Sequence, residues 1–262
     1  MILRGDFSSD VLRTTINIQY MIPENCTGPY KTVYLLHGLH ANQGTWIDNS
    51  MLPYYGKKYD AVFIMPETGR SYYSDLKYGR RFYTFISEEL PQITKNVFNI
   101  SSRREDTAVI GYSMGGNGAL RLALSRPEQY GFCGSISAVA LDFKPMLEAI
   151  RKDKSNFKYF DDTETEEFLK DLHSMCGEDL MPGPEGFIPD LIERFPDNAP
   201  KPKFFVTCGT EDSLLKENHK FRERMTNTHF DFTYEEWAGN HDWEFFNGAL
   251  KKTLAFWYSK TG

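Results

Sequence analysis

The chain has 262 residues, of which 40% are hydrophobic and 25% are charged, so it is a globular protein long enough to bury one sizeable core. Its formal net charge of −6 excludes the strongly basic surface with which proteins usually bind nucleic acid or an anionic membrane. We therefore expect neither of these as a partner.

The first residues, Met1 to Asp6, lack the charged start and the following apolar run of a secretory signal. No apolar run in the chain approaches the ~20 residues that a membrane-spanning helix requires. These features predict a cytoplasmic protein, although a signal peptide removed upstream of Met1 would leave no trace in this sequence.

The 4 cysteines are far apart and form no C-x-x-C pair, which argues against structural zinc and against a dense disulfide framework. They are Cys26, Cys133, Cys176 and Cys208. Cys133 and Cys208 lie in apolar runs that are typical of strands, so we interpret them as small buried hydrophobic residues.

The first predicted element is a half-exposed strand at Val11 to Ile22, where apolar and polar residues alternate with the two-residue period of a strand. We expect it to be an outer, antiparallel strand. Later runs are short and apolar without alternation, as in parallel strands that are covered on both faces. These runs are 32–36, 61–65, 107–110, 132–138 and 204–207.

Segments with apolar residues at helical spacing separate these strands. One is the stripe from Phe82 to Val97, which Pro91 is expected to kink or break. Two others are residues 116–125 and 242–260. The inward positions of the last segment are Phe245, Phe246, Leu250, Leu254 and Trp257. Strands that alternate with helices imply crossover connections and a doubly wound, mostly parallel α/β sandwich.

Residues 142–202 interrupt this alternation. They contain a helical pattern at 163–175 and a short apolar segment at 187–195, but no clear strand. The stretch is too long for a plain connection and too short and polar for a second domain. We interpret it as an insertion over the functional site of a single domain that spans residues 1–262. The alternative is a crossover helix with exposed loops that contact no ligand.

The segment Gly111-Tyr112-Ser113-Met114-Gly115 follows the apolar run 107–110 and precedes a predicted helix. Glycines beside a serine allow a strained turn that holds the hydroxyl at the carboxyl end of a sheet. In this context G-x-S-x-G predicts a nucleophilic serine, Ser113. The alternative is a glycine-rich turn that binds a phosphate at the N-terminus of the helix.

A serine hydroxyl is a poor nucleophile at neutral pH, so it needs a base and an acid that orients the base. After this type of elbow the order along the chain is serine, acid, histidine. His241 lies in a glycine-containing loop between a predicted strand at 230–237 and the last helix, and it is our candidate base. The other histidines are His37, His40, His173, His219 and His229.

Asp212 is the first candidate for the acid, because it directly follows the apolar run 204–207 and a loop there reaches the carboxyl edge of the sheet. Glu211 is its neighbour, and Asp142 follows an earlier predicted strand, so both remain alternatives. Asp212 could also cap the helical segment at 217–225, and the two roles are compatible.

The developing negative charge of the intermediate needs hydrogen-bond donors, and backbone amides serve best. Met114 should supply one, as the residue after the nucleophile. Leu39 is the candidate for the second, because the preceding Gly38 permits a turn that points its amide inward. His37 and His40 could instead bind a metal at i, i+3 spacing, but no third ligand is suitably spaced, so we expect no metal.

Four motifs together resemble the esterase D family. They are His37-Gly38-Leu39-His40 with Trp46 following, Gly111-Tyr112-Ser113-Met114-Gly115-Gly116, Gly209-Thr210-Glu211-Asp212 and His241-Asp242-Trp243. This family includes S-formylglutathione hydrolases, tributyrin-type esterases and the acetylxylan and feruloyl esterases of carbohydrate esterase family 1. The likeness covers residues 30–260, and residues 72–91 are similar to the tributyrin-type branch in particular.

The resemblance implies an α/β-hydrolase without a cofactor, in which Ser113, Asp212 and His241 form the triad and the amides of Leu39 and Met114 form the oxyanion hole. It also implies a carboxylesterase that acts on small-molecule or carbohydrate esters of short acyl or small aromatic acids. A thioesterase, an acyltransferase and a non-catalytic binding module are the alternatives.

The resemblance leaves the substrate specificity open. The loop His40-Ala41-Asn42 departs from the threonine-cysteine pair that is common in S-formylglutathione hydrolases, which argues against that substrate. Aromatic side chains could line a pocket that stacks a sugar or a phenolic acid. The candidates are Trp46, Tyr72, Tyr73 and Phe187, and the favoured alternative for each of them is a position in the core. The sequence leaves the oligomeric state open.

Overall fold

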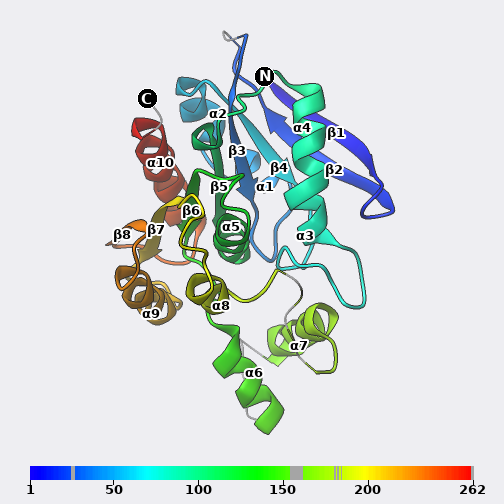
Figure 1. The fold of residues 1–262 in the computed structure, drawn as a ribbon, viewed down its shortest axis with the longest axis vertical. Helices are drawn as coiled ribbons and strands as arrows, with labels where there is room; N and C mark the ends of the chain where they lie inside the picture. The colour runs from blue at the N-terminus through cyan, green and yellow to red at the C-terminus, as the bar shows by residue number, and fades with distance from the viewer. Residues whose placement is uncertain (25–26, 154–161, 180, 182, 184, 261–262) are drawn as a thin grey trace.

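The computed structural model describes residues 1–24, 27–153, 162–179, 181, 183 and 185–260, so Cys26 and parts of the predicted insertion lie outside the described residues. Its centre is an eight-stranded sheet with the order β1-β2-β4-β3-β5-β6-β7-β8 (Figure 1). The strands are β1 (Ile2–Ser9), β2 (Thr14–Met21), β3 (Lys31–Leu36), β4 (Ala61–Pro66), β5 (Thr107–Tyr112), β6 (Phe132–Ile136), β7 (Lys203–Gly209) and β8 (Asp231–Trp237).

The six strands from β3 to β8 pair in parallel, and each apolar run predicted to be a strand coincides with one of them. The run predicted at 132–138 is two residues too long, because β6 ends at Ile136. Strands β1 and β2 pair in antiparallel fashion, and β2 joins the parallel part through β4. This sheet with helices on both sides is the α/β-hydrolase architecture, which confirms the predicted fold class.

The strand predicted at 11–22 is antiparallel, as expected, but it is not the outermost strand. β1 lies outside it and forms the edge of the sheet. The sequence prediction missed β1 because Arg4, Gly5 and Asp6 occupy its middle and residues 2–6 are exposed, so no apolar alternation marks it. The first residues of the predicted strand instead form a turn, in which Arg13 has a φ of 54°.

Helices cover both faces of the sheet (Figure 1). They are α1 (Thr45–Asp48), α2 (Leu52–Tyr55), the 3₁₀ turn η1 (Gly56–Lys58), α3 (Phe82–Thr84), the π-helical η2 (Phe85–Glu89), α4 (Leu90–Val97), the 3₁₀ turn η3 (Arg104–Asp106), α5 (Met114–Ser125), α6 (Phe143–Lys152), α7 (Asp162–Cys176), α8 (Ile188–Glu193), α9 (Leu215–Thr226) and α10 (Trp243–Ser259). Among the described residues, no helix is both long and apolar enough to cross a membrane.

Alternate residues along the central strands enter two separate cores. In β3, Val33 and Leu35 pack on the face that α10 covers, whereas Tyr34 and Leu36 pack on the opposite face, which α5 covers. This double burial explains why the parallel strands have continuous apolar sequences. The inward positions predicted for the last helix, Phe245, Phe246, Leu250, Leu254 and Trp257, are all buried.

The helix predicted at 82–97 is interrupted, as Pro91 led us to expect. It forms α3, then η2, then α4, with Pro91 in the first turn of α4. Proline has no N–H to complete the helical hydrogen bond and crowds the preceding turn, and the wider π turn ahead of it accommodates this disruption.

Between β6 and β7 the described residues form three helices and no strand. Here α7 and α8 agree with the predicted helical and apolar segments, whereas α6 was not predicted. The signal for α6 was present in Phe143, Leu147 and Ile150, which recur at helical spacing and are buried. Figure 1 shows α6 and α7 at one end of the molecule, beyond the central layers.

Leu250→Ala is expected to lower the free energy of unfolding by about 2–5 kcal/mol, because a smaller side chain would leave a cavity. Leu250 is 0% exposed, between α10 and the sheet. Lys251→Ala, at the exposed next position, should change this value by less than about 0.5 kcal/mol. Urea-induced unfolding measures both, and equal effects would contradict the placement of α10.

Candidate active site

Ser113 lies in a sharp turn between β5 and α5, with φ 52° and ψ −121°. This conformation is unfavourable for a residue with a side chain. The flanking glycines allow the turn because a β-carbon on Gly111 would lie 2.1 Å from Gly115 O, and one on Gly115 would lie 2.3 Å from Leu36 O. The turn therefore has the geometry expected of a nucleophile elbow.

Three side chains that were predicted to act together lie in one hydrogen-bonded chain. His241 Nε2 is 3.0 Å from Ser113 Oγ, and His241 Nδ1 is 2.9 Å from Asp212 Oδ2. Because an ionised carboxylate only accepts hydrogen bonds, Nδ1 carries the ring hydrogen and Nε2 is free to accept the serine proton. This arrangement can turn the hydroxyl into an effective nucleophile.

Asp212 is held in place by a second hydrogen bond. Its Oδ1 accepts from the N–H of Leu214 at 2.8 Å, in the turn before α9. The N-cap of α9 is Leu214, and no side chain caps this helix, so the predicted capping role of Asp212 was wrong. Burial raises the pKa of Asp212, but the hydrogen bond and the electrostatic attraction of His241 outweigh burial. The pKa therefore lies below its ordinary value, and Asp212 is a carboxylate at neutral pH.

The two alternative acids point elsewhere. Asp142 forms an ion pair with Arg224 of α9, with an N–O distance of 3.6 Å. Glu211 is exposed at the surface. Among the described residues, Asp212 is thus the acidic side chain that hydrogen-bonds to His241.

The loops that carry the acid and the base are joined through their backbones. The N–H of Thr210 donates to Trp237 O at 2.9 Å, and the N–H of Glu211 donates to Gly239 O at 3.0 Å. A β-carbon on Gly209 would lie 2.1 Å from Gly239 O, so this approach requires glycine. The contact holds the two loops side by side.

The start of the helix that follows His241 is held by a capping side chain. Asp242 caps α10, with its Oδ1 accepting from the N–H of Phe245 at 3.0 Å. The ring of His241 packs edge-on against Phe246, with centroids 5.0 Å apart. The imidazole is therefore positioned by packing as well as by hydrogen bonds.

The two amides predicted as oxyanion donors are available for a ligand. Met114 is the first residue of α5, where N–H groups have no acceptor within the helix. Leu39 lines the cleft beside Ser113, and within the described parts of the chain its N–H has no hydrogen-bond acceptor. Among the described residues neither N–H donates to another backbone group, so both remain candidates for the oxyanion donors.

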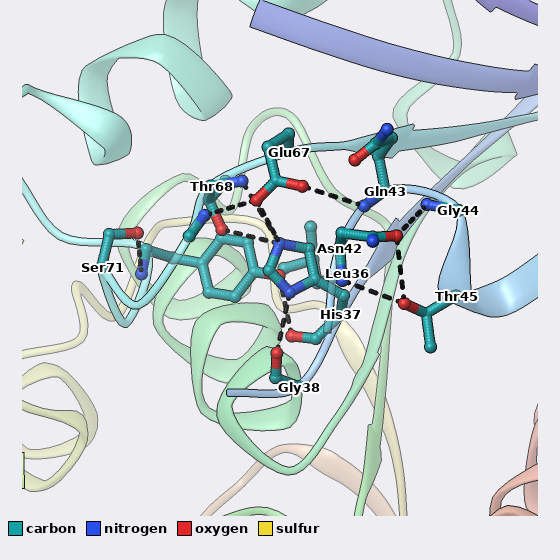
Figure 2. A network of polar contacts seen from close by, with 12 residues as sticks. Leu36, His37, Gly38, Asn42, Gln43, Gly44, Thr45, Glu67, Thr68 and Ser71 are labelled. Atoms are coloured by element: carbon teal, nitrogen blue, oxygen red, sulfur yellow. Dashed lines mark hydrogen bonds and ion pairs between the residues drawn. The ribbon is translucent and has the colours of Figure 1, made fainter. Parts of the chain in front are cut away.

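The buried imidazole of His37 fixes the loop that carries Leu39 (Figure 2). Its Nδ1–H donates to Gly38 O at 2.8 Å, while Nε2 accepts from the N–H and the hydroxyl of Thr68, each at 3.2 Å. Gly38 C=O and Leu39 N–H belong to one planar peptide, so holding the oxygen also sets the direction of the amide. Burial lowers the pKa of His37, which keeps the ring neutral and preserves this tautomer.

His37 and His40, considered above as alternative metal ligands, form hydrogen bonds to different partners. His40 Nε2 is 3.1 Å from a carboxylate oxygen of Glu164 in α7, whereas His37 is bound as described. Over the residues that the structure describes, no three His, Cys, Asp or Glu side chains are grouped as metal ligands. Sequence reasoning missed the positioning role of His37, because Thr68 is 31 residues away in the chain.

A cleft of about 480 Å³ opens beside Ser113 and His241. Its walls include the Leu39 loop, the indole of Trp243, and the side chains of Thr45 and Asn49. Glu164 and Asp242 add two acidic groups, and no Lys or Arg lines the cleft in the described part of the chain. None of these side chains was predicted to line a pocket, although Trp243 lies within the His241 motif.

The aromatic residues considered as pocket candidates lie in the core, which was the favoured alternative. They are Trp46, Tyr72, Tyr73 and Phe187. Trp46 and Tyr72 are 0% exposed, and none of the four lines the cleft. Trp46 Nε1 donates to Leu36 O at 3.1 Å, and the Tyr73 hydroxyl donates to His37 O at 2.9 Å. These two side chains thus support the backbone of the oxyanion loop.

Comparisons relate this fold to known proteins. Residues 9–174 match the family described as putative esterase. The chain is 30% identical over 236 residues to an acetyl esterase of Caldicellulosiruptor saccharolyticus, which covers 88% of this chain and 84% of that protein. It is 30% identical over 151 residues to S-formylglutathione hydrolase of Bos taurus, covering 49% of this chain and 52% of that protein. The fluorophosphonate-binding serine hydrolase F of Staphylococcus aureus has the same fold, with a TM-score of 0.80 and 22% identity over 98% of both chains.

Asp212→Asn is expected to lower kcat for p-nitrophenyl acetate by about 10⁴, because an amide that donates to Nδ1 favours the wrong tautomer of His241. Asp142→Asn and Glu211→Gln are matched controls at the alternative acids and should keep kcat close to the wild-type value. Steady-state kinetics of the three variants tests the assignment. A loss in either control as large as that at Asp212 would contradict it.

His37 is expected to make the fold less stable as the pH falls. Its pKa is lowered by burial in the folded state, so below the ordinary value of 6.5 the unfolded chain binds a proton that the folded chain does not. The stability is therefore full above this pH and falls below it, by up to about 1.4 kcal/mol per pH unit, until the folded pKa is reached. His37→Gln should flatten this dependence, as measured by urea unfolding from pH 7 to pH 5. Identical slopes for both proteins would refute the linkage.

Proposed function

Because the chain belongs to the putative esterase family, we propose that it is a serine carboxylesterase that hydrolyses short acyl or small aromatic acyl esters through an acyl-enzyme on Ser113. The observation that carries this proposal is the chain from Asp212 through His241 to Ser113, with hydrogen bonds of 2.9 and 3.0 Å. Such a chain activates a hydroxyl for attack on a carbonyl carbon.

In the proposed mechanism, Ser113 Oγ attacks the ester carbonyl while His241 Nε2 takes its proton. The carbonyl oxygen becomes negative and accepts hydrogen bonds from the amides of Leu39 and Met114. His241 then protonates the leaving alcohol as the tetrahedral intermediate collapses to the acyl-enzyme. A water molecule, deprotonated by the same imidazole, releases the acid and restores the hydroxyl. Asp212 stabilises the imidazolium in both halves of the cycle.

The cleft supports small, uncharged substrates. Its volume of about 480 Å³ suits a short or single-ring acyl group with part of its alcohol. Thr45 and Asn49 provide neutral polar groups beside the apolar indole of Trp243, a combination that can bind hydroxylated leaving groups such as sugars. Acetyl, butyryl and feruloyl esters are therefore the proposed substrates.

We further propose that residues 142–202 form an insertion over this site, within a single α/β-hydrolase domain that spans residues 1–262. Glu164 of α7 supports this role, because it lines the cleft and its carboxylate contacts His40 of the oxyanion loop at 3.1 Å. A segment that served only as a connection would not need to contribute a cleft residue.

Thioester hydrolysis is the second candidate, since the chain resembles S-formylglutathione hydrolase over about half its length. Glutathione carries two carboxylates, which would meet the carboxylates of Glu164 and Asp242 in a cleft where no described Lys or Arg balances them. Repulsion between like charges in a partly enclosed site raises the free energy of such a complex. The charge of the cleft therefore favours neutral esters.

A substrate panel tests both candidates. We expect kcat/KM to be higher for p-nitrophenyl acetate, p-nitrophenyl butyrate and methyl ferulate than for S-acetylglutathione. Ser113→Ala should lose at least ~10³ in rate on every substrate and should no longer react with a fluorophosphonate probe. Glu164→Gln should narrow the gap between the thioester and p-nitrophenyl acetate, because it removes one negative charge from the cleft.

Each alternative has its own outcome in this experiment. Near wild-type turnover by Ser113→Ala would contradict the mechanism itself. Faster hydrolysis of S-acetylglutathione than of the esters would assign the second candidate instead. Acyl transfer to an added sugar that exceeds hydrolysis would identify an acyltransferase.

A further inference from the structure

The open edge of β1 is the feature of the fold that the proposed function does not use. β1 is the outermost strand of the sheet (Figure 1), and among the described residues it pairs with β2 alone. The register of this pair is unbroken from Ile2↔Met21 to Ser9↔Thr14. Proteins usually protect such an edge with charged side chains, proline, a bulge or a covering element, because unpaired N–H and C=O groups recruit another strand. β1 carries two charged residues of opposite sign, Arg4 and Asp6, which can pair with each other across two copies. β1 has neither a proline nor a bulge along its whole length.

The backbone groups at this edge follow from the pairing with β2. The N–H of Ile22 donates to Met1 O at 2.8 Å, so Met1 directs its carbonyl toward β2. In an antiparallel ladder this direction alternates from one residue to the next. The even-numbered residues from 2 to 8 therefore direct their N–H and C=O groups away from the sheet, where a further strand could pair with them.

A second copy of the chain can pair there only in certain registers. A two-fold axis perpendicular to the sheet keeps every side chain on its own face, so residues directly opposite each other must both be odd or both be even. Such a register is centred on one residue. Centring on Arg4 would oppose Arg4 to itself, and centring on Asp6 would oppose Asp6 to itself, and both arrangements place like charges together.

Centring on Gly5 gives a complementary arrangement instead. It places Arg4 opposite Asp6 of the second copy on one face, twice by symmetry, and Leu3 opposite Phe7 on the other face. Leu3 is 42% exposed, so this contact would remove an apolar side chain from water. Nothing lies within 4 Å of a β-carbon on Gly5, so a side chain introduced there would meet no neighbour on its face of the sheet.

We propose that two copies of this chain associate through antiparallel pairing of β1 centred on Gly5, which continues the sheet across the dimer. Arg4 now contacts Asp48 at 3.3 Å, and Asp6 accepts from Asn17 at 3.1 Å. Both contacts are exposed to solvent, where such interactions contribute little, so exchanging them for contacts across the dimer costs little.

Sedimentation velocity of the full chain over a range of concentrations tests the proposal. The wild-type chain should dimerise. Arg4→Asp should raise the dissociation constant about tenfold or more, because it replaces two attractive pairs with two repulsive ones. Asp6→Arg should do the same, and the double variant Arg4→Asp/Asp6→Arg should restore dimerisation. Lys251→Asp, with the same change of charge on exposed α10, is the control.

A crosslinking experiment tests the register without changing any charge. Gly5→Cys should form a disulfide between two copies on oxidation, because the two positions face each other at the closely spaced kind of pair. Ser8→Cys is the matched control and should not, since position 8 would face position 2. Oxidised wild-type protein gives the background from the chain's own cysteines.

A chain that stays monomeric at high micromolar concentration would overturn the proposal. A dimer with the same dissociation constant in Arg4→Asp and Asp6→Arg would also overturn it, because another surface would then hold the copies together. Weakening by both single variants without rescue by the double variant, or crosslinking of Ser8→Cys as readily as Gly5→Cys, would reject the Gly5 register. Circular dichroism confirms that each variant is folded.

Discussion

The catalytic geometry depends on main-chain segments that approach each other more closely than a β-carbon permits. Such a carbon on Gly111 would lie 2.1 Å from Gly115 O, and one on Gly209 would lie 2.1 Å from Gly239 O. The first approach sharpens the turn that carries Ser113, the proposed nucleophile, and the second joins the loops that carry Asp212 and His241. The distances within the triad are thus set by contacts between backbones, which are stiffer than side chains. Both approaches occur where parallel strands end at one edge of the sheet.

The predictable part of the fold is the part that is covered on both faces. Strands such as β5 are continuous apolar runs, and the last helix has an apolar stripe of five residues, so both could be assigned from the sequence. β1 could not, because its residues 2–6 are exposed on both faces of the strand and therefore show no alternation of apolar and polar residues. α6 had a readable stripe, but it lies in a long region without strands, where the alternation used to assign elements gives no guidance.

The three candidate catalytic residues could be predicted, because their positions follow from the order of the strands along the chain. Ser113, Asp212 and His241 each follow the end of a strand, and a parallel sheet brings such positions to one edge. The support of the oxyanion loop was not predictable in this way. His37 meets Thr68 only because β3 and β4 are neighbours in the sheet, a pairing that the chain order does not reveal. The residues that line the cleft could not be predicted either, because burial of an individual aromatic side chain depends on packing across several elements.

The aromatic residues near the site form a support for it. Tyr112 is central, with its ring centroid 5.0 Å from Trp46, 4.9 Å from Trp243 and 4.7 Å from Phe246. Its ring also occupies the space that a β-carbon on Gly38 would need, at 2.6 Å, so the loop with the oxyanion donor rests on it. On the other side of the cluster, Phe246 packs against the imidazole of the base at 5.0 Å. One closely packed unit therefore holds both the donor loop and the base, and because such packing resists compression, neither can shift without the other. Part of the aromatic content of 15% thus lies in this support, where Trp46 packs against Tyr112 and does not face the cleft.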